Sequence, residues 1–190
     1  MKLFRTIEAV ADGNYIVGDV VDFTLNDGEE VQALAVKQED DGMLFVLLDC
    51  LADEECMNEK SSNRGGFIAA DLCAKLNGAI LDRFPAEIRE KMVAFSNGLL
   101  LRLPTEKEIF GKNVYGKDEG DAVYQWEPMK ERRYRIAFQG KNGAWEWYWL
   151  ANQVDGSAAR FAFVLNYGNA NFSIASYAYG VRPAFKISNP

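Results

Sequence analysis

The chain has 190 residues, of which 48% are hydrophobic and 26% are charged, and its formal net charge is −7. This length and composition are typical of one globular domain whose core needs neither disulfides nor metal, and the acidic balance argues against a general nucleic-acid binder. The sequence contains no histidine, which excludes serine-histidine and cysteine-histidine catalysis and histidine-ligated metal centres.

The sequence offers no segment for membrane insertion or export. No apolar run approaches the roughly 20 residues of a membrane span, and residues 1–8 lack the apolar segment of a signal peptide. We therefore expect a soluble protein without membrane insertion, cytoplasmic as synthesised or associated with a virion that lysis releases. The three cysteines, Cys50, Cys56 and Cys73, are an odd number without metal-type spacing. We expect reduced thiols, most of them packed as small apolar groups, and no metal or cofactor.

Residues 15–60 are predicted to form a β-meander. Two alternating segments, 19–25 and 31–36, and a continuous apolar segment, 43–48, are separated by turn sequences of Asn, Asp and Gly. We expect the continuous segment to be the central strand. Eleven Asp or Glu residues and a single basic residue lie between positions 27 and 59. We interpret the acidic residues as a solvated rim, because the ligand spacing of a calcium loop is absent.

The pattern becomes helical between residues 61 and 110. Two short amphipathic helices are predicted, the first ending at Asn77-Gly78 and the second running from Pro85 to Asn97-Gly98. A short apolar strand at 99–103 follows, and the Thr-Glu-Lys-Glu run at 105–108 is a capping box that opens one more helical turn. The residues expected on the buried faces of the two helices are Phe67, Leu72, Cys73, Leu76, Ile88, Met92 and Phe95.

Residues 111–138 consist of a glycine-containing loop followed by a basic, aromatic segment. The loop spans 111–125, and the segment 126–138 mixes arginines with Trp, Met, Tyr, Ile and Phe. We interpret this segment as an outer helix face or an edge strand whose arginine stems lie along apolar surface, in preference to an anion site. With strands first, helices in the middle and strands last, and without a linker or repeat, the chain is predicted to be a single α+β domain over residues 1–190.

The last third of the chain, residues 145–187, differs most in composition. It contains three of the four Trp residues, and only six charged residues lie between position 140 and the C-terminus. The three Trp residues alternate, so we expect them to support the fold with one or more facing the core. Residues 160–165 alternate as a half-buried strand does. Residues 172–179 lack a helix or strand period, and their Tyr, Phe, Ser and Asn side chains suit a loop-borne contact surface.

Two residues of this part are assigned structural roles. Gly168, between Asn166 and Asn169, is expected to make a turn. Arg182 is expected to brace the terminal strand through backbone carbonyls or a buried carboxylate. Composition alone leaves a binding surface and a well-packed loop as equal alternatives for the segment between them.

The order of motifs in the last third resembles a family of uncharacterised domains of gut bacteria and their phages. The resemblance is based on Trp-Tyr-Trp-Leu at 147–150, an alternating strand, an Asn-x-Gly turn at 166–168, and the ending Tyr-Gly-Val-Arg-Pro-Ala-Phe at 179–185. Weaker matches occur upstream in the same order, at 17–23, 47–50, 76–78, 84–88 and 103–110.

The ending is also similar to the C-type-lectin-like fold, in the variety built by formylglycine-generating enzymes and by the variable proteins of diversity-generating retroelements. In the variable proteins, adenine mutagenesis of Asn codons yields positions occupied by Asn, Ser, Tyr, Phe, Ile, Ala, Asp or Gly. Residues 166–179 consist entirely of such residues. The resemblance implies a mostly antiparallel α+β fold with two or three short helices, in which residues 140–190 form the ligand-binding region.

The sequence departs from these families in three respects. Leu-Ala-Asn at 150–152 stands where the domain family has Leu-Arg-Ser, so a role of that arginine does not carry over. The Glu-Pro-Asn and Trp-Asn-Asp motifs of calcium-dependent lectins are absent. All three cysteines lie in the first half of the chain, whereas formylglycine-generating enzymes have a catalytic cysteine pair in the C-terminal part. Neither calcium-dependent glycan binding nor that enzymatic activity is implied.

The resemblance predicts a non-catalytic binding protein, the variable protein of a diversity-generating retroelement in a phage or mobile element. It would recognise a protein or cell-surface ligand, without nucleic acid and without catalytic residues. One alternative is an enzyme that uses Glu106, Glu108 or an arginine cluster at 132–135 around an anionic substrate, and another is a structural virion component with a large apolar oligomer contact. The residues predicted to line the ligand-binding surface are Asn152, Gln153, Asp155, Asn166, Tyr167, Asn169, Asn171, Phe172, Ser173, Ile174, Ser176, Tyr177 and Tyr179.

Overall fold

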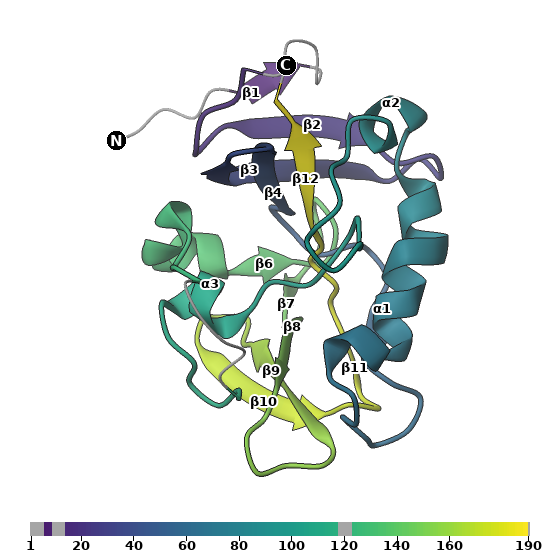
Figure 1. Cartoon of the computed structure of the whole chain (residues 1–190), viewed down its shortest axis with the longest axis vertical. Helices are drawn as coiled ribbons and strands as arrows, with labels where there is room; N and C mark the ends of the chain where they lie inside the picture. Colours follow the sequence, from purple (N-terminus) through teal and green to yellow (C-terminus); the bar gives the residue numbers. More distant parts are fainter. Residues whose placement is uncertain (1–5, 9–13, 118–122, 190) are drawn as a thin grey trace.

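The computed structural model describes residues 6–8, 14–117 and 123–189. Most of its strands are antiparallel and its helices are short, which confirms the predicted α+β class. A five-stranded sheet lies at one end of the molecule and a three-stranded sheet at the other, with a column of helical turns along one side (Figure 1). Among the residues described, no helix is long and apolar enough to cross a membrane.

The five-stranded sheet contains the predicted meander and has the order β1-β2-β3-β4-β12. β1 is parallel to β2, and the other neighbours are antiparallel. Every residue of β4 is buried and the strand lies between β3 and β12, so the continuous apolar segment is an interior strand. The expected central position is wrong, because β3 is the middle strand and β2 pairs with β3 instead of β4. The strands are β1 (Thr6–Glu8), β2 (Val20–Thr24), β3 (Glu30–Glu39), β4 (Gly42–Leu47) and β12 (Ala184–Ser188).

The terminal strand β12 joins the end of the chain to its beginning. Phe185 pairs with Phe45 of β4, and their rings stack at 5.7 Å between centroids. Because side chains alternate across a strand, neighbouring residues enter different cores. Phe45 and Phe185 enter the core beneath the helical column, and Val46 and Ala184 enter a second core around Trp126.

The first predicted helix continues further than its sequence suggests. α1 (Asp71–Lys75) is preceded by the turn η1 (Phe67–Ala69) and runs on through η2 (Leu76–Ile80) and η3 (Leu81–Arg83), seen as one column in Figure 1. The predicted end at Asn77-Gly78 is wrong. Gly78 is a local kink, and the Asn77 side chain donates to the carbonyls of Cys73 and Leu101. The predicted inner face is confirmed, since Phe67, Leu72, Cys73 and Leu76 are all buried.

The second predicted helix is shorter than expected. α2 spans only Ala86–Arg89, because the chain beyond it turns to run beside β12. There Met92 forms a β-bridge with Ile187, and the Val93 amide donates to the Lys186 carbonyl. Segment 99–103 forms a single bridge with β12 instead of a strand. The capping box is confirmed. Thr105 and Glu108 bond reciprocally at the start of α3 (Glu106–Phe110).

The remaining elements build the lower part of the molecule. The basic segment 126–138 forms two 3₁₀ turns, η4 (Glu127–Lys130) and η5 (Arg132–Arg135), and a strand, where a helix face or edge strand was expected. The second sheet has the order β10-β9-β8, with β8 at Tyr148–Gln153, β9 at Arg160–Val164 and β10 at Ala170–Ile174. Two short pairs complete the fold, β5 (Glu55–Cys56) with β11 (Ala178–Tyr179) and β6 (Ala137–Phe138) with β7 (Trp145–Glu146).

Candidate binding surface along strand β10

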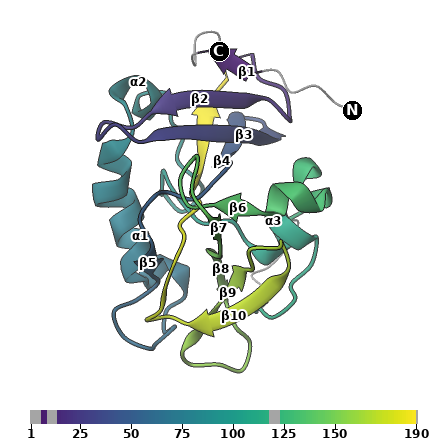
Figure 2. The same cartoon turned by 180° about the vertical axis from the view of Figure 1, so that it is seen from behind.

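Strand β9 is the platform on which β10 lies. Phe161 and Phe163 of β9 enter one core, and Ala162 and Val164 enter the other. The predicted strand is confirmed over 160–164, but the expectation of a half-buried strand is wrong, because residues 161–164 are buried on both faces. β10 pairs with its outer edge and has no second neighbour among the strands described. Each residue of β10 is half-buried, so β10 is an edge strand at the end of the molecule opposite the five-stranded sheet (Figure 2).

The β9–β10 turn forms one end of this surface. Gly168 has φ +81°, which confirms its predicted turn role, and the Leu165 amide donates to the Asn169 carbonyl. Tyr167 is 46% exposed, and Asn169 is exposed beside it. Arg132 fixes Tyr167, because its Nε donates to the Tyr167 carbonyl at 2.7 Å and its guanidinium lies 5.8 Å from the ring centroid.

One face of β10 continues into an aromatic cluster. The Ser173 and Tyr179 hydroxyls share a hydrogen bond of 2.9 Å. The Tyr179 ring stacks on Phe163 at 4.9 Å, and Trp147 stacks on the same Phe163 ring at 5.6 Å. Trp147 remains 38% exposed, so it contributes to the surface as well as to the fold, and Tyr179 contributes to packing as well as to the surface.

The Trp prediction is confirmed for one residue. Trp149 is fully buried, and its indole N–H donates to the Glu55 carbonyl at 2.8 Å. Trp145 is 65% exposed and lies in the short strand β7.

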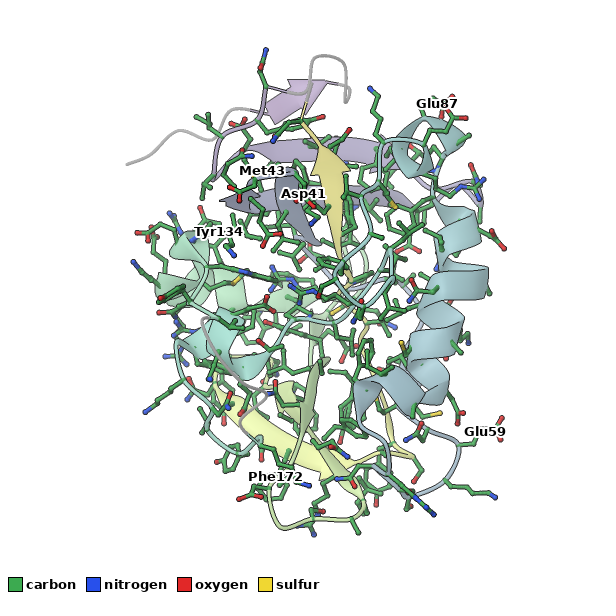
Figure 3. All side chains as sticks on the ribbon, viewed as in Figure 1. Asp41, Met43, Glu59, Glu87, Tyr134 and Phe172 are labelled. Carbon is green, nitrogen blue, oxygen red and sulfur yellow. The ribbon has the colours of Figure 1, made fainter. Side chains whose placement is uncertain are left out.

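The other face of β10 is covered by a loop residue that sequence reasoning missed. The rings of Phe172 and Tyr115 meet edge to face at 4.9 Å, and the Arg160 guanidinium lies 5.1 Å from the Phe172 centroid. Tyr115 is 38% exposed, and its carbonyl accepts from the amide of the exposed Asp155 at 2.9 Å. Figure 3 labels Phe172 at the lower end of the molecule. These contacts place an aromatic pair and one cation beside the strand.

A buried carboxylate holds Tyr115 in place. Glu106 is fully buried, and its Oε2 accepts from the amides of Val114 at 2.8 Å, Tyr115 at 3.1 Å and Gly116 at 2.8 Å. The amide of Glu106 donates to Asn152 Oδ1 at 2.7 Å. Asn152 is only 1% exposed. Its assignment to the ligand-binding surface is therefore corrected, because its side chain holds the start of α3 inside the protein.

The second end of β10 is a tight turn into β11. The Tyr177 amide donates to the Ile174 carbonyl at 3.1 Å, and the Tyr177 side chain is 55% exposed. Ser176 shares a hydroxyl bond of 2.9 Å with Ser61. The predicted loop at 172–179 is thus wrong in part. Phe172 to Ile174 belong to β10, residues 178 and 179 form β11, and only residues 175–177 are a turn.

Most of the predicted surface residues share one strip, which we call the β10 strip and define as residues 166–177. It contains Asn166, Tyr167, Asn169, Asn171, Phe172, Ser173, Ile174, Ser176 and Tyr177, and Tyr179 adjoins it. Gln153 is half-buried and donates to the Asn63 carbonyl, while Asp155 lies on the β8–β9 turn. Trp147, Tyr115 and Arg160 were not predicted as part of the surface. Tyr115 and Arg160 contact Phe172 of β10 and Trp147 contacts Phe163 of β9, through packing that no local pattern encodes.

The terminal strand is braced from within, as predicted for Arg182. This residue is fully buried; its Nε donates to the Leu47 carbonyl at 2.6 Å and its Nη1 to the Tyr134 carbonyl at 2.9 Å. Cys50 and Cys73 are buried and Cys56 is half-buried, all with free thiols. Burial raises the pKa of both Cys50 and Cys73 above the usual thiol value, so these two thiols remain protonated at neutral pH.

The polar groups named for the enzyme alternative have structural partners. Glu106 accepts the three amides described above, and Glu108 binds Arg102 through both oxygens, at 2.8 and 2.5 Å. Arg132 and Arg135 donate to backbone carbonyls of the β9–β10 turn, and Arg133 pairs with Glu131 at 2.8 Å. These contacts join neighbouring segments of the fold.

One further carboxyl has a raised pKa and lines a cleft. Asp49 borders a cleft of about 440 Å³ together with Leu48, Tyr134 and Phe138. Burial raises the pKa of Asp49, although the Phe138 amide donates to Oδ1 at 3.0 Å and opposes the shift. The lining also includes two cations, Arg133 and Lys141, so the cleft places a single acidic group among apolar and positively charged side chains.

Comparison with protein-family models, curated proteins and solved structures finds no match to this chain.

Proposed function

We propose that this chain is a non-catalytic binding protein that recognises a protein or cell-surface ligand through the β10 strip. The observation that supports the proposal is the placement of most of the predicted surface residues along one half-buried edge strand and its two turns. Tyr167 and Tyr177, 46% and 55% exposed, stand near the two ends of the strip. Large, half-exposed aromatic residues of this kind commonly dominate the energetics of protein interfaces.

Recognition would proceed by shape and hydrogen bonding. Tyr and Trp provide large contact areas with few rotatable bonds, whereas Asn and Ser provide adaptable donors and acceptors. The five residues of β10 carry no charge, so a partner does not have to desolvate an ion from this strand. The Arg132 and Glu106 contacts beneath Tyr167 and Tyr115 hold both rings in place before binding, which lowers the entropy cost of association.

We further propose a C-type-lectin-like fold of the formylglycine-generating-enzyme variety, and a role as the variable protein of a diversity-generating retroelement in a phage or mobile element. The strip is supported from beneath by Phe161 and Phe163 of β9, which lie outside residues 166–179. The half-buried positions of β10 can therefore change among small polar and aromatic residues while these core side chains stay constant. This separation of a constant core from a changeable edge is what a diversified binding protein requires.

A cell-binding assay tests the proposal. The labelled full chain would be incubated with a panel of intact bacterial strains and the bound fraction measured by flow cytometry. We expect saturable binding to a subset of strains, reduced at least tenfold in affinity by the double substitution Tyr167→Ala and Tyr177→Ala. Tyr124→Ala is the matched control, because Tyr124 is 75% exposed but lies outside the strip. Equal loss in the control and the double variant, or no loss in either, would contradict the proposal.

A further inference from the structure

A cleft lies at the end of the molecule opposite the β10 strip. It has a volume of about 430 Å³ and is bordered by the β3–β4 turn, the segment 94–97 and residues 123–126. This volume is within the range of about 300–1,000 Å³ that small-molecule sites occupy. Figure 3 shows Asp41 of this cleft beside the five-stranded sheet and Phe172 at the other end, so the cleft and the strip are separate surfaces.

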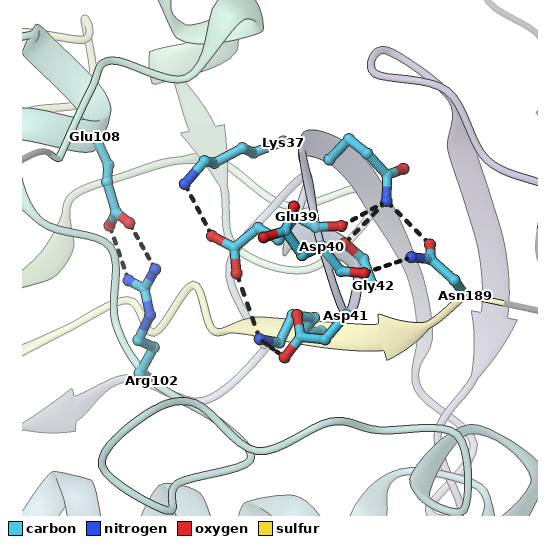
Figure 4. A network of polar contacts seen from close by, with 10 residues as sticks. Lys37, Glu39, Asp40, Asp41, Gly42, Arg102, Glu108 and Asn189 are labelled. Atoms are coloured by element: carbon cyan, nitrogen blue, oxygen red, sulfur yellow. Dashed lines mark hydrogen bonds and ion pairs between the residues drawn. The ribbon is translucent and has the colours of Figure 1, made fainter.

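Opposite charges alternate along the wall of the cleft. Lys186 Nζ lies 2.7 Å from Asp41 Oδ2 and 3.4 Å from Glu39 Oε2, and Lys37 Nζ binds the other Glu39 oxygen at 2.9 Å. The Arg102–Glu108 pair lies apart from this chain of charges (Figure 4). These lining residues are three cations and three anions. Because they carry no net charge together, their field favours neither a simple anion nor a simple cation.

Among the described residues, Lys186 is the most deeply buried lysine. Its side chain is 6% exposed, and its ammonium lies 5.7 Å from the centroid of the Phe95 ring. An ammonium has three N–H donors, and among the described residues Lys186 Nζ hydrogen-bonds to two acceptors, Asp41 and Glu39. One donor thus remains for an acceptor in the cleft. A ligand carboxylate there would form a charge-assisted hydrogen bond in a place that is mostly shielded from water.

Asp41 provides the complementary group at the same point. Its side chain is 52% exposed although it binds Lys186, so an ammonium can approach it from the cleft. The two charges of an α-amino acid are carried by groups on the same carbon atom, and the ammonium and carboxylate of Lys186 and Asp41 lie 2.7 Å apart. The carboxylate and ammonium of the ligand can therefore lie beside the Lys186–Asp41 pair in the opposite order, so that the ligand carboxylate faces Lys186 and the ligand ammonium faces Asp41.

An aromatic rim adjoins these charges. Tyr124 is 75% exposed and Val123 is 38% exposed, and both border the cleft above the buried Trp126. An apolar ligand side chain that packs against this rim would remove exposed hydrophobic surface from water. We propose that the cleft binds a small zwitterion of the α-amino-acid class with an apolar side chain, its carboxylate on Lys186, its ammonium on Asp41 and its side chain on Tyr124.

Three probes that share a phenylethyl skeleton and differ in which charged groups they carry test this proposal. L-Phenylalanine is a zwitterion, 3-phenylpropionate is an anion and 2-phenylethylamine is a cation, and isothermal titration calorimetry would measure each on the full chain. We expect the zwitterion to bind at least tenfold more tightly than either singly charged probe. Equal binding of a singly charged probe would contradict the proposal, as would the absence of heat with millimolar L-phenylalanine.

Two variants locate the site. Asp41→Asn and Tyr124→Ala change exposed side chains, so both variants are expected to fold. Each should weaken L-phenylalanine binding. Asp41→Asn should weaken it at least tenfold, because it removes the charged partner of the ligand ammonium. Asp155→Asn, at an exposed carboxylate on the β8–β9 turn, is the control and should bind as the unmodified chain does. Unchanged binding in Asp41→Asn would show that the probe binds elsewhere and would overturn the proposal. Cell binding through the β10 strip should be unaffected by any probe.

Discussion

The carboxylate of Glu106 accepts a hydrogen bond from the backbone amide of Tyr115 at 3.1 Å, and the ring of Tyr115 packs against Phe172 of the edge strand. A fully buried charge at the start of α3 thus sets the position of an aromatic residue on the candidate binding surface. The carboxylate tolerates burial because three consecutive backbone amides donate hydrogen bonds to it. This contact connects a capped helical turn with the strip over which a ligand would lie.

Glu106→Gln is expected to loosen this support. The amide side chain keeps one acceptor oxygen but loses the charge and places two donors among backbone amides, so the free energy of unfolding should fall by about 2–3 kcal/mol. Urea denaturation measures the change. Glu87→Gln, at an exposed position in α2, is the matched control and should alter stability by less than about 0.5 kcal/mol. Equal stability of the two variants would show that the amide cluster does not depend on the charge.

Substitutions of Tyr177 and Tyr179 distinguish a residue that is free to contact a ligand from a residue that packs in the fold. Tyr177→Ala should change the free energy of unfolding by less than about 0.5 kcal/mol, since the side chain is 55% exposed. Tyr179→Ala should cost about 2–3 kcal/mol, because this ring stacks on Phe163 at 4.9 Å and contacts Trp149 at 4.8 Å. Denaturant unfolding of both variants checks the difference. Comparable losses in the two would contradict the assignment of Tyr179 to the packed cluster.

Gly168 and Gly156 form a second matched pair. Both have positive φ, +81° and +68°, but a Cβ at Gly168 would lie 3.2 Å from the Arg132 carbonyl oxygen, whereas Gly156 has open space. Gly156→Ala should cost about 1 kcal/mol from the backbone conformation alone, and Gly168→Ala should cost more and also displace Tyr167. Thermal and urea unfolding compare the two. Better tolerance of Gly168→Ala than of Gly156→Ala would contradict the close contact between Gly168 and the Arg132 carbonyl.

Glu146 makes stability depend on pH in a defined direction. Burial, and then the neighbouring Glu54, raise the pKa of Glu146 above its ordinary value of 4.5. A raised pKa means that the folded state holds this proton more tightly than the unfolded state does. The stability contributed by Glu146 is therefore present below the ordinary pKa and is lost as pH rises through the raised pKa.

Glu146→Gln should remove the loss of stability that deprotonation of Glu146 causes as pH rises. The variant should be more stable than the unmodified chain at neutral pH, and the difference should shrink as pH falls towards 4.5. Urea unfolding across this pH range gives the difference directly. Glu54→Gln removes the repelling neighbour and should also raise the stability at neutral pH, by a smaller amount. A stability difference between Glu146→Gln and the unmodified chain that is the same at every pH would rule out titration of Glu146 as the cause.

The sequence predicted those elements whose signals are local. The apolar run of β4, the capping box at Thr105 and Glu108, the turn at Gly168 and the carbonyl contacts of Arg182 each follow from residue chemistry over a few positions. The helix predicted from Pro85 failed because pairing with β12 outweighed a weak helical period after Arg89. Non-local pairing of this kind leaves no trace in a local pattern.

In the candidate site, too, the features with local signals were predicted and those that depend on non-local contacts were not. Its composition indicated a contact surface, and the chain order placed most of its residues on one strand and two turns. The family resemblance predicts Asn152 on the ligand-binding surface, yet its side chain accepts a hydrogen bond from the Glu106 amide inside the protein. Tyr115 could not be found, since it reaches Phe172 only through a loop fixed by Glu106. The charge chain at Lys186 likewise combines residues from β12 and the β3–β4 hairpin.

The central claim is that the β10 strip is a changeable binding surface on a constant fold. Sequencing of the coding region for residues 140–190 across many natural isolates tests it most directly. We predict amino-acid variation concentrated in the β10 strip, residues 166–177. Trp149, Phe161 and Phe163, which lie in the core beneath it, and the Gly-Val-Arg-Pro run at 180–183, which braces the terminal strand, should be unchanged. Variation spread evenly along the region, or a β10 strip as constant as its core, would contradict the account.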